Sequence, residues 1–294
     1  AGGWHYYFPF VYLVKEPLPT IILVLTALLV SLWGIGRILV RQRWAARWRF
    51  AEYLGTHFTE FALISFVVLY WAYSIQSPLN IGFRHLFPTL PFIYILTIGF
   101  WKRWLTDLQL PPTDNSWQLL WRGLRAIVTS SVEYTALVIL LVWFAAETVL
   151  SAPYFLSYFN ELGGGPWNGY KLVTDSNYDW GQDLIRLQAF VAAHPEIDKI
   201  GVDYFGGGEP KYYLGDKEEN WWSSRGSPRN TDIKWFAISI NTLQGAIQKP
   251  APGFQRNSWD EYSWLTQARP PKTGLGEVPT PDYRIGTSIF VYKL

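Results

Sequence analysis

Long apolar runs alternate with short polar loops in the first half of the chain, and no such run recurs after residue 153. The four runs cover residues 18–40, 58–75, 81–101 and 126–150. Their lengths are close to the roughly 20 residues that a helix needs to cross the hydrocarbon core of a bilayer. The pattern predicts a polytopic α-helical membrane region with about four spans over residues 1–158, beginning with an aromatic interfacial segment at residues 4–9.

Beyond residue 153 the pattern changes to short alternating elements. Residues 170–174 and 199–204 predict strands, and residues 182–193 between them predict an amphipathic helix. This order indicates a βαβ unit, and therefore a small α/β domain over residues 159–294. Further strands are expected at 234–240 and 285–292, a short helix at 211–214, and long loops at 215–231 and 250–282.

Basic residues set the expected orientation in the membrane. Lys and Arg in short loops are retained on the cytoplasmic side. The loops after the first and third runs should therefore be cytoplasmic, because they carry Arg41, Arg43, Arg47 and Arg49, and then Lys102, Arg103, Arg122 and Arg125. By parity, the N-terminal segment and the α/β domain should lie outside. We expect a protein integral to the cell membrane with an extracytoplasmic C-terminal domain.

Composition supports two unlike halves. The 294 residues are 49% hydrophobic and 16% charged, with a mean hydropathy of +0.04. The formal net charge is only +2 and the basic residues are dispersed, so nucleic acid is not expected as a partner. Cys is absent and the histidines lack metal-ligand spacing, so no metal site is expected. The start, "AGGWHYY", resembles neither an initiator region nor a signal peptide, and we expect a longer natural chain.

The segment "DSNYDWGQD" at residues 175–183 concentrates polar chemistry. It fails as a calcium-binding EF-hand loop, because Trp180 takes the place of the required glycine. Asp179 followed by Gln182 favours a helix N-cap. The other polar residues of the segment follow a predicted strand, where α/β domains often place ligands. The candidate sugar- or acceptor-binding residues here are Asp175, Asn177, Asp179 and Asp183.

Two further motifs carry candidate chemistry. Gly206, Gly207 and Gly208 follow a predicted strand and precede the short predicted helix, so their N–H groups could hold an anion or a sugar hydroxyl. A plain tight turn explains them equally well. Arg84 and His85 lie at the outer end of the third run, where ionisable residues are costly and often mark a site. Together they could clamp a lipid phosphate, although snorkelling to the interface is the simpler alternative.

Several segments together resemble one family of membrane enzymes. The chain is similar to the C-terminal portion of phospholipid-carrier-dependent glycosyltransferases, in the broad protein mannosyltransferase and aminoarabinose transferase superfamily with the GT-C membrane fold. The resemblance rests on "WHYYFPFVYLVKEPLP", "NIGFRHLFPTLPFIYIL", "YFLSYFNELGGGPWNGYKLVTDSNYDWGQDLIRL", "VDYFGGGEPKYYLG", "WFAISINTLQG" and "RIGTSIFVYKL".

The resemblance implies transfer of a sugar from a polyprenyl-phosphate carrier at the extracytoplasmic face. It matches Arg84 and His85 to an Arg-His pair near the carrier phosphate, and Lys15 to a lysine that follows an aromatic-Pro segment. The lipid-linked sugar donor would be a substrate, with the bilayer as partner, and no cofactor is implied. The family's catalytic carboxylates belong to an N-terminal half without a counterpart here, so no catalytic residue is assigned.

Two other classes of function remain open. One is a non-catalytic, transferase-derived scaffold subunit that packs against other membrane-protein subunits in a larger complex. The other is a membrane-tethered carbohydrate-binding domain. A longer natural chain that includes a catalytic membrane region would favour the enzyme over both.

Overall fold

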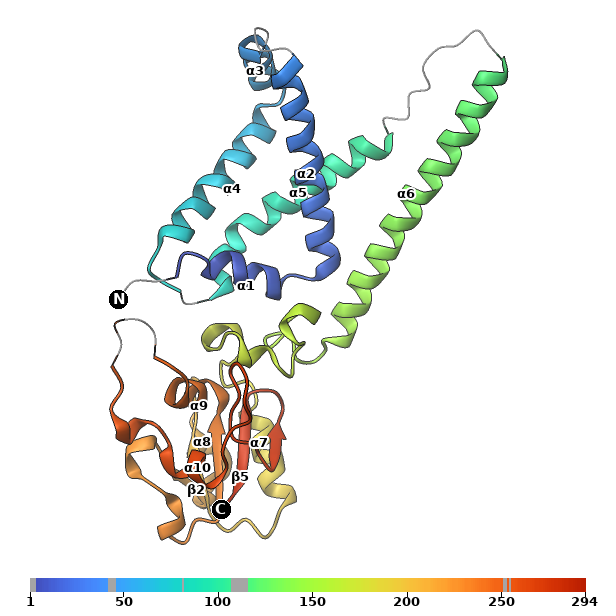
Figure 1. Ribbon diagram of the computed structural model, residues 1–294. Helices are drawn as coiled ribbons and strands as arrows, with labels where there is room; N and C mark the ends of the chain where they lie inside the picture. Colours follow the sequence, from blue (N-terminus) through green and yellow to red (C-terminus); the bar gives the residue numbers. More distant parts are fainter. Residues whose placement is uncertain (1–3, 42–45, 81, 107–115, 251–252, 254) are drawn as a thin grey trace. The chain divides into compact units, whose positions relative to one another are not determined.

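The computed structural model describes residues 4–41, 46–80, 82–106, 116–250, 253 and 255–294 (Figure 1). The chain forms two compact units. The first, here called the sheet unit, comprises Ala1–Lys15, Ser77–Arg84 and Ser151–Leu294. The second, the helical unit, comprises Glu16–Gln76 and His85–Leu150. The sheet unit thus draws on three separate stretches of chain, including residues that precede the boundary expected at 158.

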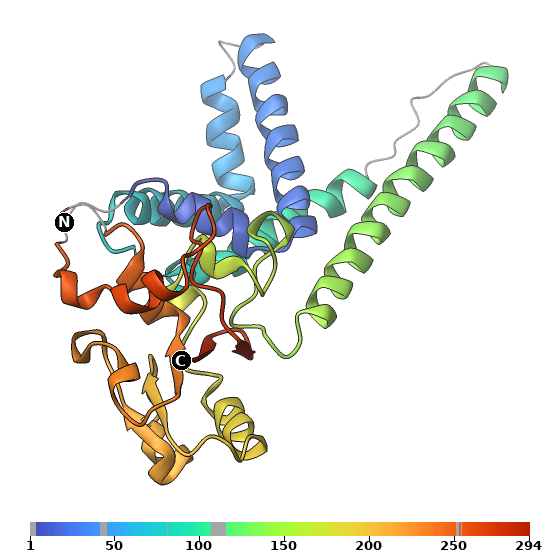
Figure 2. The same cartoon turned by 60° about the horizontal axis from the view of Figure 1, so that its bottom comes forward.

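Four helices are long and apolar enough to cross a membrane, which confirms the number predicted. They are Leu18–Val40, Phe58–Gln76, Phe83–Leu105 and Ser116–Leu150. The corresponding elements are α2 (Leu18–Arg41), α4 (Phe58–Gln76), the 3₁₀ stretch η1 (Phe83–Thr89) with α5 (Leu90–Thr106), and α6 (Ser116–Leu150). Helix α3 (Ala46–Thr56) lies between α2 and α4 along the chain. Helix α6 runs without interruption, and it begins ten residues before the predicted run (Figure 2).

The third candidate span begins as a 3₁₀ helix for a local reason. Pro88 lies inside η1, and Pro91 follows in the first turn of α5. Proline lacks a backbone donor and disfavours the α conformation of the residue before it, so the α-helix becomes regular only from Leu90. Residues 107–115, and the side chains of Arg41, Arg43, Arg47 and Arg49, lie outside the described part of the structure.

Polar side chains join the helices of the helical unit at a few points. Trp101 Nε1 donates to the Leu23 carbonyl over 3.2 Å, which links α5 to α2. Arg103 and Glu60 form an ion pair of 3.0 Å between α5 and α4. Large apolar side chains on the outer surfaces are exposed, among them Leu29, Leu69 and Val142. Such extensive exposed apolar surface is typical of membrane or protein contact.

The sheet unit is built around five strands in the order β2-β1-β3-β5-β4. These are β1 (Ile200–Asp203), β2 (Glu218–Asn220), β3 (Trp235–Ser239), β4 (Tyr283–Ile285) and β5 (Ile289–Lys293). The first three are mutually parallel, whereas β5 is antiparallel to both β3 and β4. The helices of the unit are α1 (Tyr7–Lys15), α7 (Leu184–Ala193), α8 (Pro210–Leu214), α9 (Ile240–Ile247) and α10 (Ser263–Ala268).

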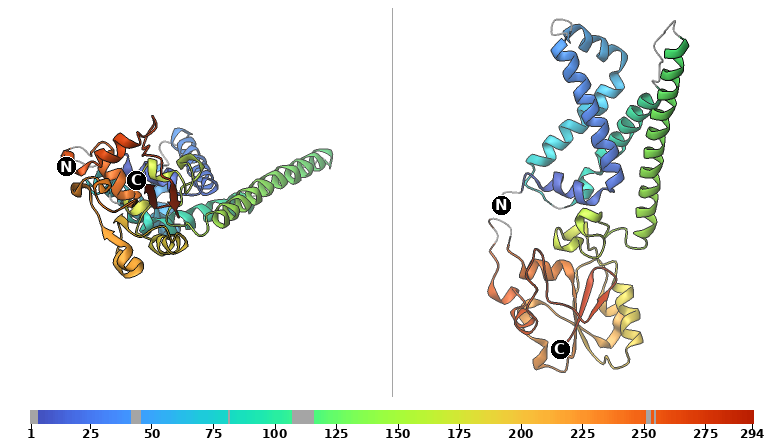
Figure 3. Two further views of the ribbon diagram at one scale, coloured as in Figure 1. Left: turned by 90° about the horizontal axis from the view of Figure 1, so that it is seen from below. Right: turned by 45° about the vertical axis from the view of Figure 1, so that its right-hand side comes forward.

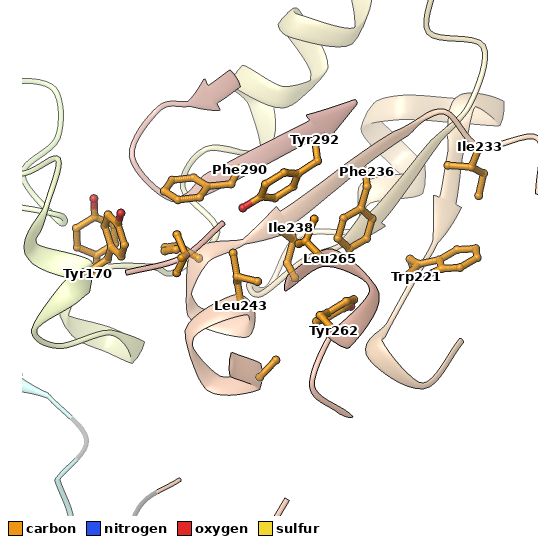
Figure 4. Close-up of a cluster of buried hydrophobic side chains, with 14 of the residues drawn as sticks. Tyr170, Trp221, Ile233, Phe236, Ile238, Leu243, Tyr262, Leu265, Phe290 and Tyr292 are labelled. Atoms are coloured by element: carbon orange, nitrogen blue, oxygen red, sulfur yellow. The ribbon is translucent and has the colours of Figure 1, made fainter. Parts of the chain in front are cut away.

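Helices cover both faces of this sheet, which makes it an α/β arrangement (Figure 3). Strand β3 is buried along its whole length, and its side chains alternate between two cores. Trp235 and Ala237 join a cluster with α7 and Leu214 of α8. Phe236 and Ile238 join a second cluster with α9, α10 and strand β5 (Figure 4).

The strand predicted at residues 170–174 is wrong, and with it the βαβ unit that it opened. A 3₁₀ turn at Gly169–Lys171 takes its place. Gly169 packs so closely on Phe159 that a Cβ there would come within 2.1 Å of the ring. Tyr170 is buried edge-on against Phe290 at 5.5 Å between ring centroids. The aromatic character of this segment therefore reflects burial in the core and not strand pairing.

The remaining predictions for this half need smaller corrections. The strands at 199–204 and 234–240 and the short helix at 211–214 are confirmed as β1, β3 and α8. The helix expected from 182 begins at Leu184. The strand expected at 285–292 is a hairpin, because Gly286 turns the chain with φ of 56°. The two expected long loops contain β2 and α10.

Candidate functional site

The strand order defines one special edge of the sheet. Strand β1 continues through α8 to β2 on one side, whereas β3 continues through α9 toward β5 on the other. The connections that follow the carboxyl ends of β1 and β3 therefore lead to opposite sides of the sheet. Open α/β sheets place ligands at this kind of switch point. The N–H of Phe205 donates to Ser239 Oγ over 2.9 Å, which ties the two departing loops together.

The segment 175–183, here called the acidic loop, contacts this edge through glycines. Tyr204 Oη donates to the Gly181 carbonyl over 2.9 Å. A Cβ added to Gly181 would lie 2.9 Å from the Cα of Gly206. A Cβ added to Gly208 would likewise lie too close to the Leu184 side chain. The absence of side chains at 206–208 thus lets the acidic loop pack closely against this turn. Of the three glycines, only Gly207 faces open space.

Asp179 is completely buried in the acidic loop. Its Oδ1 accepts the N–H of Gly181 over 2.8 Å, while Oδ2 has no hydrogen-bond partner among the described residues. Burial raises the pKa of Asp179 to about 7, despite the lowering effect of the Gly181 N–H. The predicted N-cap role is wrong, because the helix begins at Leu184 and Asp183 occupies the N-cap position.

Asp183 is buried as well, but its carboxylate is fully used. Oδ2 accepts the backbone N–H groups of Thr287 and Ser288, each over 2.8 Å, and the Ser288 hydroxyl over 2.9 Å. Oδ1 pairs with Arg186. These bonds join the start of α7 to the β4–β5 turn, so Asp183 has a structural role in this structure.

Asn177 and Lys15 connect the three stretches of the sheet unit. Asn177 Oδ1 accepts the N–H of Phe83 over 2.9 Å, and Nδ2 donates to Tyr7 Oη over 3.0 Å. Lys15 Nζ donates to the carbonyls of Asn177 and Leu156 over 2.7 and 3.0 Å. Burial lowers the pKa of Lys15 to about 7. Both predicted ligand residues are therefore occupied in holding the fold together.

Asp175 differs from its neighbours because its carboxylate is available. No described residue bonds to it, while its backbone N–H donates to Asn241 Oδ1 over 2.9 Å. Its backbone is left-handed with φ of 53°, which is costly for a residue with a side chain. Strain of this kind is often retained at functional positions.

Arg84 and Trp180 form an exposed pair on the sheet unit. The Arg84 guanidinium lies 5.1 Å from the centroid of the Trp180 ring and bonds to no described residue. Trp180 is 46% exposed, and Nε1 donates to the Ser176 carbonyl over 3.3 Å, which orients the indole. His85, the next residue in the chain, belongs to the helical unit.

Comparison with known proteins leaves the chain without an assigned family. No family model, no curated protein and no solved structure matches it significantly. Among the described residues, no group of three or more His, Asp or Glu side chains could hold a metal ion.

Sequence reasoning missed four residues that build this site. Trp180 entered only as a mismatch to a calcium loop, although an aromatic residue among carboxylates is itself typical of sugar-binding surfaces. Nothing in the local sequence marks Tyr7, Tyr204 or Asn241 as part of the site. Each of them acts through a hydrogen bond to a residue at least 23 positions away.

Proposed function

We propose that this chain is the C-terminal part of an integral-membrane glycosyltransferase that uses a polyprenyl-phosphate-linked sugar donor at the extracytoplasmic face. The observation that carries the proposal is the exposed Arg84–Trp180 pair. Within this proposal, the sheet unit is the extracytoplasmic domain and the four apolar helices cross the cell membrane.

The pair offers complementary surfaces for a sugar phosphate. A guanidinium presents a planar fork of donors that binds two phosphate oxygens at once. Its position over the indole orients that fork and favours the cation through the ring's electron-rich face. The exposed part of the Trp180 ring is a broad apolar surface on which the C–H face of a sugar can pack.

Chain connectivity supports a lipid-linked ligand over a soluble one. Arg84 is the second residue of the candidate span Phe83–Leu105. In an inserted protein it would therefore lie at the polar end of that span, at the depth of lipid phosphates. A cation there would stabilise the phosphate that leaves when the sugar is transferred.

Asp175 is the carboxylate best placed to orient a hydroxyl of the sugar or acceptor. It is available, close in sequence to Trp180, and fixed in a strained backbone conformation. We assign no catalytic base, in keeping with the family resemblance, which places the catalytic carboxylates in an N-terminal half. A non-catalytic scaffold would need the hydrogen bonds by which Asn177 and Asp183 hold the fold together. It would not need an Asp175 carboxylate or an Arg84 guanidinium that is available to a ligand.

Binding of a polyprenyl-phosphate sugar to the purified chain in lipid nanodiscs tests the proposal, with the uncharged polyprenol as control ligand. Arg84→Ala should weaken binding by about tenfold or more, because charge-assisted hydrogen bonds to phosphate are lost. Arg84→Lys should recover only part of the affinity, since a lysine lacks the fork. Trp180→Ala should weaken binding of the sugar-bearing carrier more than binding of polyprenyl phosphate alone.

Arg229→Ala is the matched control, because Arg229 is also an exposed arginine of the sheet unit. It should leave carrier binding unchanged. Equal binding of the phosphate and the polyprenol, or equal affinities for Arg84→Ala and Arg229→Ala, would refute the carrier site and favour the scaffold.

A further inference from the structure

A polar cavity lies on the sheet unit and shares no lining residue with the Arg84–Trp180 pair. It has a volume of about 170 Å³ and is bordered by the 3₁₀ turn at Gly169–Lys171 and by the segment 272–284. A water molecule in the liquid occupies roughly 30 Å³, so the cavity can hold a polyatomic ligand. The lining residues that matter here are Tyr170, Lys171, Lys272, Glu277, Thr280 and Arg284.

The charges around this cavity do not balance. Three of the lining side chains are basic and only one is acidic. Lys171 and Glu277 neutralise each other in an ion pair of 2.6 Å. Lys272 forms no hydrogen bond or ion pair with a described residue, and the charge of Arg284 is not matched by a carboxylate on the lining. Two positive charges therefore face the cavity without a counter-charge.

Arg284 is held in a fixed orientation. Its Nη1 donates to the Trp167 carbonyl over 3.1 Å, and the guanidinium lies 4.8 Å from the centroid of the Phe290 ring. Two aromatic rings contact it, since the Tyr170 ring centroid is 5.7 Å away. A guanidinium fixed in this way loses little conformational freedom when it binds an anion.

The two walls of the cavity are also fixed to each other. Gln244 of α9 donates to the Tyr170 carbonyl over 3.3 Å and to the Gly276 carbonyl over 2.7 Å. Gly276 has φ of 62°, and a Cβ there would lie 2.2 Å from the Lys171 carbonyl oxygen. The segment 272–284 therefore packs directly on the backbone of the 3₁₀ turn, and the cavity exists before any ligand binds.

We propose that this cavity binds the phosphate group of a small soluble molecule. Arg284 donates to the phosphate as a fork, and Lys272 supplies the second cation. Glu277 and Thr280 border the same space and can hydrogen-bond to hydroxyl groups that accompany the phosphate, as in a sugar phosphate. This site shares no residue with the Arg84–Trp180 pair, so either proposal can fail without the other.

Titration calorimetry of the full chain in detergent tests the site, with inorganic phosphate, a hexose 1-phosphate and the free hexose as probes. Inorganic phosphate should bind and the free hexose should not, and the hexose 1-phosphate should bind at least as tightly as inorganic phosphate. Lys272→Gln should weaken phosphate binding by about tenfold, and added salt should weaken it in the wild type. Vesicles containing phosphatidic acid should not compete for the site.

The variants separate the site from a general surface attraction. Lys249→Gln removes another exposed lysine of the sheet unit, which does not line the cavity, and should leave phosphate binding unchanged. Equal affinity of Lys272→Gln and Lys249→Gln, no binding of phosphate above that of the hexose, or displacement by the vesicles would overturn the proposal. Because Lys272 bonds to no described residue, Lys272→Gln should fold normally, with the melting temperature of the wild type.

Discussion

Asp179→Asn should stabilise the protein at mildly alkaline pH. The native carboxyl is fully buried, and its Oδ2 lacks a hydrogen-bond partner among the described residues. An asparagine of the same shape keeps an oxygen that can accept the N–H of Gly181, and it removes the need to bury a negative charge. The substitution therefore removes an electrostatic cost while retaining the hydrogen bond from the Gly181 N–H.

The magnitude follows from the pKa of Asp179, which burial raises from 3.8 to about 7. The folded state binds a proton more tightly than the unfolded state, so the contribution of Asp179 to stability is full below pH 3.8. It decreases as the pH rises and is lost above about pH 7. At 1.36 kcal/mol per pKa unit the decrease is at most about 4 kcal/mol. Allowing for the amide's own unmet donor, Asp179→Asn should gain about 2 kcal/mol at pH 8.

The assay is the free energy of unfolding in detergent from pH 5 to pH 9, compared between the wild type and Asp179→Asn. The difference should be small near pH 5 and should grow in favour of the variant up to about pH 8. Asp183→Asn is the matched control from the same loop. Because the Asp183 carboxylate accepts hydrogen bonds from Thr287 and Ser288 and pairs with Arg186, Asp183→Asn should lose about 2–3 kcal/mol throughout. A difference for Asp179→Asn that does not change with pH would refute the reasoning.

Two further predictions follow from the packing and the topology. Gly181→Ala should destabilise the sheet unit by about 1–3 kcal/mol in a denaturant titration, because φ is 76° and the new Cβ would lie 1.9 Å from Tyr204 Oη. Gly207→Ala should be nearly neutral, since its surroundings are open, and equal losses would contradict the close approach. The chain has no cysteine, so Ser224→Cys and Glu52→Cys each provide a single label. A membrane-impermeant maleimide should label intact cells only at Ser224→Cys, and the opposite pattern would reverse the proposed orientation.

Sequence-based prediction was most accurate where the apolar composition of a segment alone determines its secondary structure. Four apolar runs became four apolar helices, because a run of about 20 such residues has few other folded states. Strand β3 was predictable for the same reason, since "WFAIS" is buried on both sides. The start of the third candidate span depended instead on the positions of Pro88 and Pro91.

Prediction failed where distant contacts decide the outcome. Residues 169–171 form a 3₁₀ turn, with Gly169 packed on Phe159 and Tyr170 packed on Phe290. Asp179 has the spacing of a helix cap, yet the glycines at 181 and 206 bring it into the interior instead. The Arg84–Trp180 pair could not be found from spacing, because the two residues are 96 positions apart and meet only through the fold.

The joining of three chain stretches at Asn177 restricts how the polypeptide can thread a bilayer. Tyr7 and Lys15 precede the first apolar helix, Phe83 is the first residue of the third, and Asn177 follows the fourth. Segments bonded to one side chain must be on the same side of any membrane that the helices cross. An even number of crossings therefore separates each pair, so the four helices can insert only as two hairpins. Losing one crossing would leave Asn177 and one of its partners on opposite sides of the bilayer.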